Sequence, residues 1–214
     1  MNIYNVIILD ESGSMSSIYN ATLSSMNEVL NGIRRNQEEF PEQRHYVTIV
    51  TFEGSGMSGV KTRRDRVPIS TVDPFTEKDY RPGGCTPLYD AMGKTLNELE
   101  GLIHPEDKVM ATVITDGMEN SSREYSGRTI KNMVSRLREK GWALAYIGAN
   151  QDSFEVARDL NIGNALNFDA TPKGVEEMSV RFCLSSKRMS KLARFGIDLG
   201  SQENLFAEGE DEQE

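Results

Sequence analysis

The chain has 214 residues, of which 37% are hydrophobic and 27% charged, and its formal net charge is -9. This length and hydrophobic content fit one globular domain with a single core. The acidic balance argues against non-specific nucleic-acid binding, because that activity requires clustered Lys and Arg to neutralise phosphates. No segment of the sequence approaches the roughly 20 apolar residues of a membrane-spanning helix. We therefore expect neither a nucleic-acid nor a membrane partner.

The amino-terminal region and the cysteine content bear on the cellular setting. The chain enters a strand-like run at Ile3 without a basic region or a long apolar stretch before it, so we expect no signal peptide. Two cysteines, Cys85 and Cys183, do not make a disulfide framework, and the sequence does not assign them to a bridge. A reduced, cytoplasmic setting is expected.

Strand-like and helix-like segments alternate along the chain. In order, the pattern predicts a strand at 3–9, a helix at 18–38, a strand at 46–52, an edge strand at 60–69, a helix from about 86, a strand at 109–114, a helix at 128–140, a strand at 142–147, a helix at 154–160, a strand at 165–168 and a helix at 175–195. Such alternation is typical of an α/β fold. We expect a doubly wound, mostly parallel central sheet with one antiparallel edge strand and helices on both faces.

The last residues differ in composition from the rest. Five acidic residues without a basic partner crowd the final seven positions: Glu208, Glu210, Asp211, Glu212 and Glu214. Such a run repels itself and stays solvated. We expect one domain over residues 1–200 and an acidic, disordered tail over 201–214, with an interaction tail as the alternative.

The loop after the first strand carries the strongest chemical signal. Four aliphatic residues, Val6 to Leu9, lead directly into Asp10-Glu11-Ser12-Gly13-Ser14. A carboxylate and two hydroxyls at alternate positions can converge on one point, and such hard oxygen donors suit Mg²⁺, Ca²⁺ or Mn²⁺ rather than zinc. The alternative is an ordinary turn in which Asp and Ser cap backbone groups.

Two later segments favour the metal interpretation. Thr115-Asp116-Gly117 follows the strand at 109–114, and Thr86 opens the helix that leads into that strand. In an open parallel sheet, ligands bind at the carboxyl ends of the strands where the strand order reverses. Thr86 before Pro87 has an alternative role as a helix N-cap. The residues expected at one edge of the sheet are Asp10, Ser12, Ser14, Thr86 and Asp116.

These motifs resemble the metal-ion-dependent adhesion site of von Willebrand factor type A (vWA) domains, which have a Rossmann-like fold. The resemblance covers residues 1 to about 196 and rests on Asp10-x-Ser12-x-Ser14, on Thr86 within Gly83-Gly84-Cys85-Thr86-Pro87-Leu88, and on Thr115-Asp116-Gly117, in the family's order. Two further stretches, 146–151 and 167–171, resemble a bacterial, stand-alone branch of that family.

The resemblance implies a role for each residue. Ser12 and Ser14 would bind Mg²⁺ (or Mn²⁺ or Ca²⁺) directly, Asp10 and Asp116 would act through water or by holding the hydroxyls, and Thr86 would join or leave with conformational state. An open coordination position would take water or a partner's carboxylate. Neutral direct ligands leave the ion's charge uncompensated, so it attracts Asp or Glu strongly. We expect a metal-dependent protein-binding module that captures an acidic side chain of an unidentified protein partner, and not an enzyme.

A serine hydrolase that uses Ser12 is the leading alternative. That chemistry requires a histidine base beside the nucleophile. The chain's two histidines, His45 and His104, adjoin strand starts and should lie at the opposite edge of the sheet. We also expect Glu11 to point away from the ion, with a place on the rim as the alternative. Cys85 is expected to be a small packed residue, because a thiol is a poor Mg²⁺ ligand.

Overall fold

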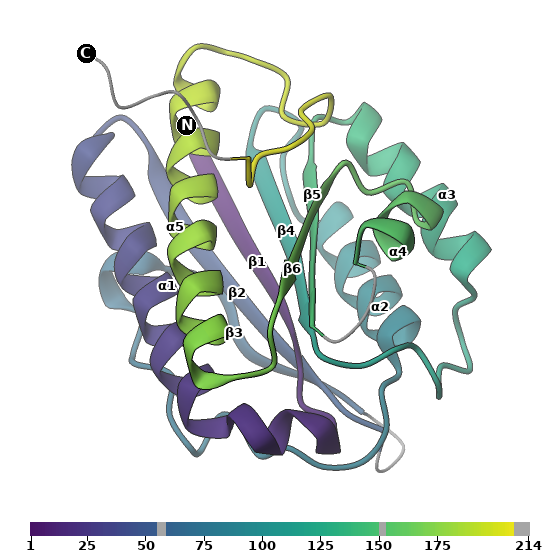
Figure 1. Cartoon of the computed structure of the whole chain (residues 1–214). Helices are drawn as coiled ribbons and strands as arrows, with labels where there is room; N and C mark the ends of the chain where they lie inside the picture. The colour runs from purple at the N-terminus through teal and green to yellow at the C-terminus, as the bar shows by residue number, and fades with distance from the viewer. Residues whose placement is uncertain (55–58, 150–152, 208–214) are drawn as a thin grey trace.

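The computed structural model describes residues 1–54, 59–149 and 153–207 (Figure 1). Within these residues, six strands form one sheet in the order β3-β2-β1-β4-β5-β6, in which only β3 runs antiparallel to its neighbour. The predicted doubly wound sheet with one antiparallel edge strand is confirmed. The strands are β1 (Asn2–Asp10), β2 (Arg44–Phe52), β3 (Val60–Pro68), β4 (Lys108–Thr115), β5 (Ala143–Ala149) and β6 (Asn164–Phe168).

Helices cover both faces of the sheet (Figure 1). On one face lie α1 (Tyr19–Glu39) and α5 (Pro172–Arg194), and on the other lie α2 (Leu88–Glu100), α3 (Gly127–Glu139) and α4 (Ser153–Asp159). None of the helices in the described residues has the length and apolar character needed to cross a membrane.

The first strand is aliphatic because it is buried on both sides. Successive side chains of a strand point to opposite faces of the sheet. Ile7 and Leu9 belong to the apolar cluster under α1 and α5, whereas Val6 and Ile8 belong to the cluster under α2 and α3. A central parallel strand therefore reads as a continuous apolar run instead of an alternating one.

Most predicted boundaries agree with the structure within one to three residues, the usual uncertainty at element ends. The start of α2, at Leu88 instead of about residue 86, bears on the candidate site. The N-cap position of α2 is Pro87 and no side chain caps it, so the alternative role of Thr86 as the N-cap is wrong. Thr86 therefore lies in the loop before the helix. A short 3-10 helix, Gly13–Ile18, also precedes α1.

The antiparallel edge strand β3 pairs irregularly with β2. The register shifts between Val47 and Val50, and Arg66 of β3 has a positive φ of 47°. A bulge of this kind, together with charged side chains, protects a sheet edge from pairing with another chain.

The packed part of the chain continues beyond α5. Leu199, Leu205 and Phe206 are buried in the same apolar cluster as α1 and α5. The Leu205 amide donates a 2.8 Å hydrogen bond to the buried Asn164 side chain at the start of β6. Residues 150, 151 and 208–214 lie outside the described part of the chain, so the boundary at residue 200 and the disordered tail stay predictions.

Candidate metal centre

The two central strands of the sheet place the first and third motifs side by side. β1 and β4 are parallel neighbours, with Leu9 opposite Ile114. Asp10 is the last residue of β1, and Asp116 follows Thr115 at the end of β4. The strand order reverses between β1 and β4, which is the position where open α/β sheets bind ligands. The prediction that these strands are neighbours is confirmed.

The Asp10 carboxylate shapes the loop that follows β1. One oxygen, Oδ1, accepts a 2.7 Å hydrogen bond from the Ser12 amide, and the other, Oδ2, accepts a 2.5 Å bond from the Thr115 hydroxyl. The Asp10 side chain is completely buried. It therefore holds its own loop in a turn and ties that loop to the end of β4.

The serine hydroxyls form a chain that leads to Asp116. The Ser12 and Ser14 hydroxyl oxygens are 3.2 Å apart, and the Ser14 hydroxyl donates a 2.6 Å bond to Oδ1 of Asp116. Ser12 and Asp116 are buried, whereas Ser14 is exposed. The cluster therefore opens to solvent at Ser14.

The segment that carries Thr86 is joined to both other loops by hydrogen bonds of its backbone. Its amide donates a 2.9 Å bond to the Asn120 side chain, and the Asn120 amide donates a 3.2 Å bond to the Thr86 carbonyl. Two residues before it, the Gly84 carbonyl accepts a 3.1 Å bond from the Gly13 amide. These bonds fix Thr86 between the loop after β1 and the loop after β4.

At Gly117, in the loop after β4, three oxygens from the other two loops converge. A Cβ atom built on Gly117 would lie 3.2 Å from the Thr86 hydroxyl, 3.8 Å from Oδ2 of Asp10 and 3.8 Å from the Ser14 hydroxyl. Because glycine has no Cβ, no side chain of this residue fills the point. With Ser12 and Asp116 attached through Ser14, the structure brings all five predicted residues to one edge of the sheet.

The donor set fits a hard cation. Every side-chain atom described above as facing this point is an oxygen, which suits Mg²⁺, Mn²⁺ or Ca²⁺. Within the described residues no group of three or more His, Cys, Asp or Glu could hold a metal ion, so a cation here depends on hydroxyl ligands.

Asp10 and Glu11 are adjacent buried carboxylates with opposite surroundings. Glu11 lies within ion-pair distance of Arg63 (3.1 Å) and Lys61 (3.6 Å) of β3. In the described part of the chain no cationic side chain pairs with Asp10, and burial, only partly opposed by the bonds from Thr115 and Ser12, raises its pKa to about 6. Burial likewise raises the pKa of Asp116. Arg63 and Lys61 neutralise Glu11, and a bound cation would provide the corresponding positive charge beside Asp10.

Some of these features were not predicted from the sequence. Glu11 points away from the metal centre toward β3, as expected, but its cationic partners lie 50 or more residues away and no local pattern identifies them. Asn120 was also missed, although it stands only four residues after Asp116 in the same loop. The expected packing of Cys85 is wrong: this side chain is exposed, because the loop before α2 carries it to the surface.

The histidines lie far from Ser12 along the strands. His45 stands near the start of β2, opposite Ile3, and is buried with hydrogen bonds to Asn5 and Gln43. Burial lowers its pKa to about 4, so the imidazole is neutral at physiological pH. His104 precedes β4. Neither residue is placed to act as a base for Ser12.

Comparisons with known proteins identify the fold. No family model and no curated protein sequence match the chain. Among solved structures, the pilus adhesin SpaC of Lactobacillus rhamnosus GG matches with a TM-score of 0.66 and 13% identity, over 88% of this chain and 30% of the adhesin. A von Willebrand factor type A structure from Catenulispora acidiphila matches with a TM-score of 0.54 and 15% identity, over 86% of this chain and 42% of that one.

A third similar structure is the manganese-loaded TRAP protein of Plasmodium vivax, with a TM-score of 0.53 and 14% identity, over 85% of this chain and 71% of TRAP. The chain thus spans less than half the length of the adhesin and of the Catenulispora chain. At these identities the likeness concerns the fold alone. The chain has the von Willebrand factor type A fold, as the sequence motifs predicted.

The raised pKa of Asp10 predicts that Asp10→Asn stabilises the metal-free protein at neutral pH. A pKa of about 6 in place of 3.8 corresponds to a cost of about 3 kcal/mol for the charged carboxylate, a cost present above pH 6 and lost as the pH falls below 3.8. An asparagine can keep the bond from the Ser12 amide and donate to Thr115, whose hydroxyl can then donate to the Gly117 carbonyl 3.0 Å away.

Thermal melting in EDTA at several pH values tests this prediction. The variant should melt above wild type at pH 7.5, and the difference should shrink as the pH falls from 6 towards 4. An Asp10→Asn protein that melts well below wild type at pH 7.5 would show that the carboxylate chiefly stabilises the loop through its hydrogen bonds.

Proposed function

We propose that this chain is a metal-dependent protein-binding module that captures an acidic side chain of a partner. The Ser12 and Ser14 hydroxyls would hold Mg²⁺ (or Mn²⁺ or Ca²⁺) directly, and Thr86 would join according to conformational state. Asp10 and Asp116 would act through water or by holding the hydroxyls. The observation that supports the proposal is the convergence of three oxygens, from Thr86, Asp10 and Ser14, on Gly117 of the loop after β4.

The hydrogen bonds of the cluster suit these roles. The Ser14 hydroxyl donates its proton to Asp116 and accepts a bond from Ser12, so one lone pair remains available to a cation. Both oxygens of Asp10 already accept bonds from Ser12 and Thr115, which favours an indirect role for this carboxylate. When bound, the cation would supply an open coordination position whose charge attracts a carboxylate. Because Ser14 is exposed, a partner's Asp or Glu can reach that position.

Binding is favoured over catalysis because no histidine lies beside Ser12 in the described structure to act as its base. The only two histidines of the chain lie toward the opposite edge of the sheet, which disfavours the serine-hydrolase alternative. An adhesin and a manganese-loaded protein are among the structures that share the fold, and both are consistent with a metal-dependent interaction. The proposed partner is a protein, not nucleic acid or membrane. The free thiols Cys85 and Cys183 agree with the proposed cytoplasmic setting.

The first test is metal binding. Wild type should bind one Mn²⁺ or Mg²⁺, and the double variant Ser12→Ala/Ser14→Ala should lose at least about tenfold in affinity, equivalent to about 1.4 kcal/mol. Isothermal titration calorimetry measures this, and Ser16→Ala is the matched control because Ser16 is an exposed serine of the same 3-10 helix. Unchanged Mn²⁺ affinity in the double variant would remove the site from these residues.

Gly117→Ala tests the position of the cation without altering any proposed ligand. The added methyl would occupy the space between Thr86, Asp10 and Ser14, at 3.2 Å from the nearest oxygen, so the variant should fold but bind Mn²⁺ far more weakly. The control is Gly83→Ala, since a Cβ at Gly83 would meet no atom within 4 Å. Calorimetry with equal affinities for Gly117→Ala and wild type would place the cation elsewhere.

Partner capture should depend on the same site. Immobilised wild type should retain a protein from native lysate in Mg²⁺ and release it in EDTA, while Ser12→Ala/Ser14→Ala should retain none in either buffer. In the captured partner, changing the contacting Asp or Glu to Asn or Gln should abolish retention. Capture that persists in EDTA would mean that the cation has at most a structural role.

A further inference from the structure

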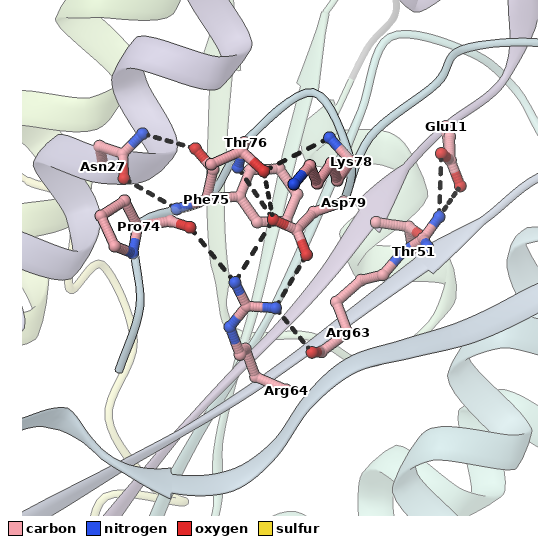
Figure 2. Close-up of polar contacts among 10 residues, drawn as sticks. All are labelled: Glu11, Asn27, Thr51, Arg63, Arg64, Pro74, Phe75, Thr76, Lys78 and Asp79. Carbon is pink, nitrogen blue, oxygen red and sulfur yellow. Dashed lines mark hydrogen bonds and ion pairs between the residues drawn. The ribbon is translucent and has the colours of Figure 1, made fainter. Parts of the chain in front are cut away.

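Glu11 stands between two proposed metal-site residues but is turned away from the metal centre. Its side chain is completely buried, and both carboxylate oxygens receive bonds at 3.1 Å from the same guanidinium nitrogen of Arg63 (Figure 2). Lys61 adds a second positive charge at 3.6 Å. Removing one partner of a buried ion pair leaves the other charge uncompensated, so this arrangement strongly fixes the position of Glu11.

The cationic side of this pair is itself held in place. The Nε atom of Arg63 donates a 2.9 Å bond to the hydroxyl of Thr51, a completely buried residue of β2. A hydrogen bond to the sheet thus orients Arg63 independently of its contact with Glu11. The planar guanidinium has a fixed arrangement of donors, which gives directional control that a lysine would not provide.

Glu11 also binds the segment that carries Thr86. Its Oε1 atom accepts a 2.5 Å bond from the Arg81 amide, and its backbone carbonyl accepts a 2.8 Å bond from the Gly83 amide. The Gly13–Gly84 bond lies next to these two. The segment 81–86 is thus joined to the loop after β1 by three successive bonds, two of which end on Glu11.

The neighbouring arginine secures the earlier part of the same segment. Arg64 binds Asp79 at 2.8 and 3.3 Å (Figure 2). Tyr80, which follows Asp79, is fully buried and donates a 2.9 Å bond to the Asp10 carbonyl. The consecutive arginines of β3 therefore anchor the segment before Thr86 at two places.

We infer that Glu11 is a positioning residue: the Arg63–Glu11 ion pair fixes the segment that carries Thr86 against the loop that carries Ser12 and Ser14. The edge strand β3 thereby sets the separation between the Thr86 hydroxyl and the two serine hydroxyls. The part of this inference that concerns metal affinity rests on the proposed function. The attachment of the two loops does not.

Glu11→Gln tests the inference, because it removes the charge while keeping the size of the side chain. In EDTA, hydrogen exchange of the Gly13 and Gly83 amides should accelerate by about tenfold or more, while exchange within α2 should not change. Mn²⁺ affinity measured by calorimetry should fall by about tenfold. Arg63→Lys, which keeps the charge but loses the guanidinium geometry, should shift both measurements in the same direction, and it carries the test if Glu11→Gln does not fold.

Glu100→Gln is the matched control. Glu100 also binds one arginine and one lysine, Arg136 and Lys140, but it lies at the end of α2 remote from Thr86. This variant should change neither measurement. Wild-type exchange rates at Gly13 and Gly83 in Glu11→Gln would overturn the inference, as would loosened loops with unchanged Mn²⁺ affinity. Absence of Mn²⁺ binding to wild type would refute the proposed function instead, and the exchange rates would still decide whether Glu11 holds the loops together.

Discussion

The organisation of the candidate site depends on the buried carboxylate of Asp10. This group ends the central strand β1, turns the following loop through the Ser12 amide, and joins it to β4 through Thr115. All of these hydrogen-bond donors are neutral, so they hold the carboxylate without cancelling its charge. A buried carboxylate in such surroundings is costly unless a cation is supplied from outside.

The adjacent Glu11 is a buried carboxylate with a structural role, and the chain neutralises its charge. Arg63 and Lys61 reach it from the edge strand, and its remaining bonds organise the neighbouring segment. The two consecutive acidic residues thus differ: cationic side chains of the protein neutralise the charge of Glu11, whereas in the described residues none neutralises the charge of Asp10. This difference supports a functional interpretation of Asp10 better than burial alone would, since burial is common to both.

Features that arise from residues close together in the sequence were predicted, whereas those that join distant residues were not. The aliphatic run of β1, the alternation of elements and the Asp10–Ser14 motif are local patterns, and they were sufficient for the fold class and for the edge of the sheet where five residues meet. The ion pair between Glu11 and Arg63 joins residues 52 positions apart, and the pattern of β3 indicated only an exposed charged edge. Likewise, α2 begins at Leu88 and the Thr86 amide binds the Asn120 side chain, a contact that helix periodicity does not reveal.

Residue 1 and the last described residues lie at the edge of the sheet opposite the candidate site. The Met1 carbonyl accepts a bond from Arg44 at the start of β2, and Asn204 donates to Gly163 just before β6. A tether attached near residue 1 or residue 207 would therefore leave the Ser14 opening facing away from the anchoring point. Attachment through this edge would leave the opposite edge, with the Ser12, Ser14 and Thr86 hydroxyls, facing the solution.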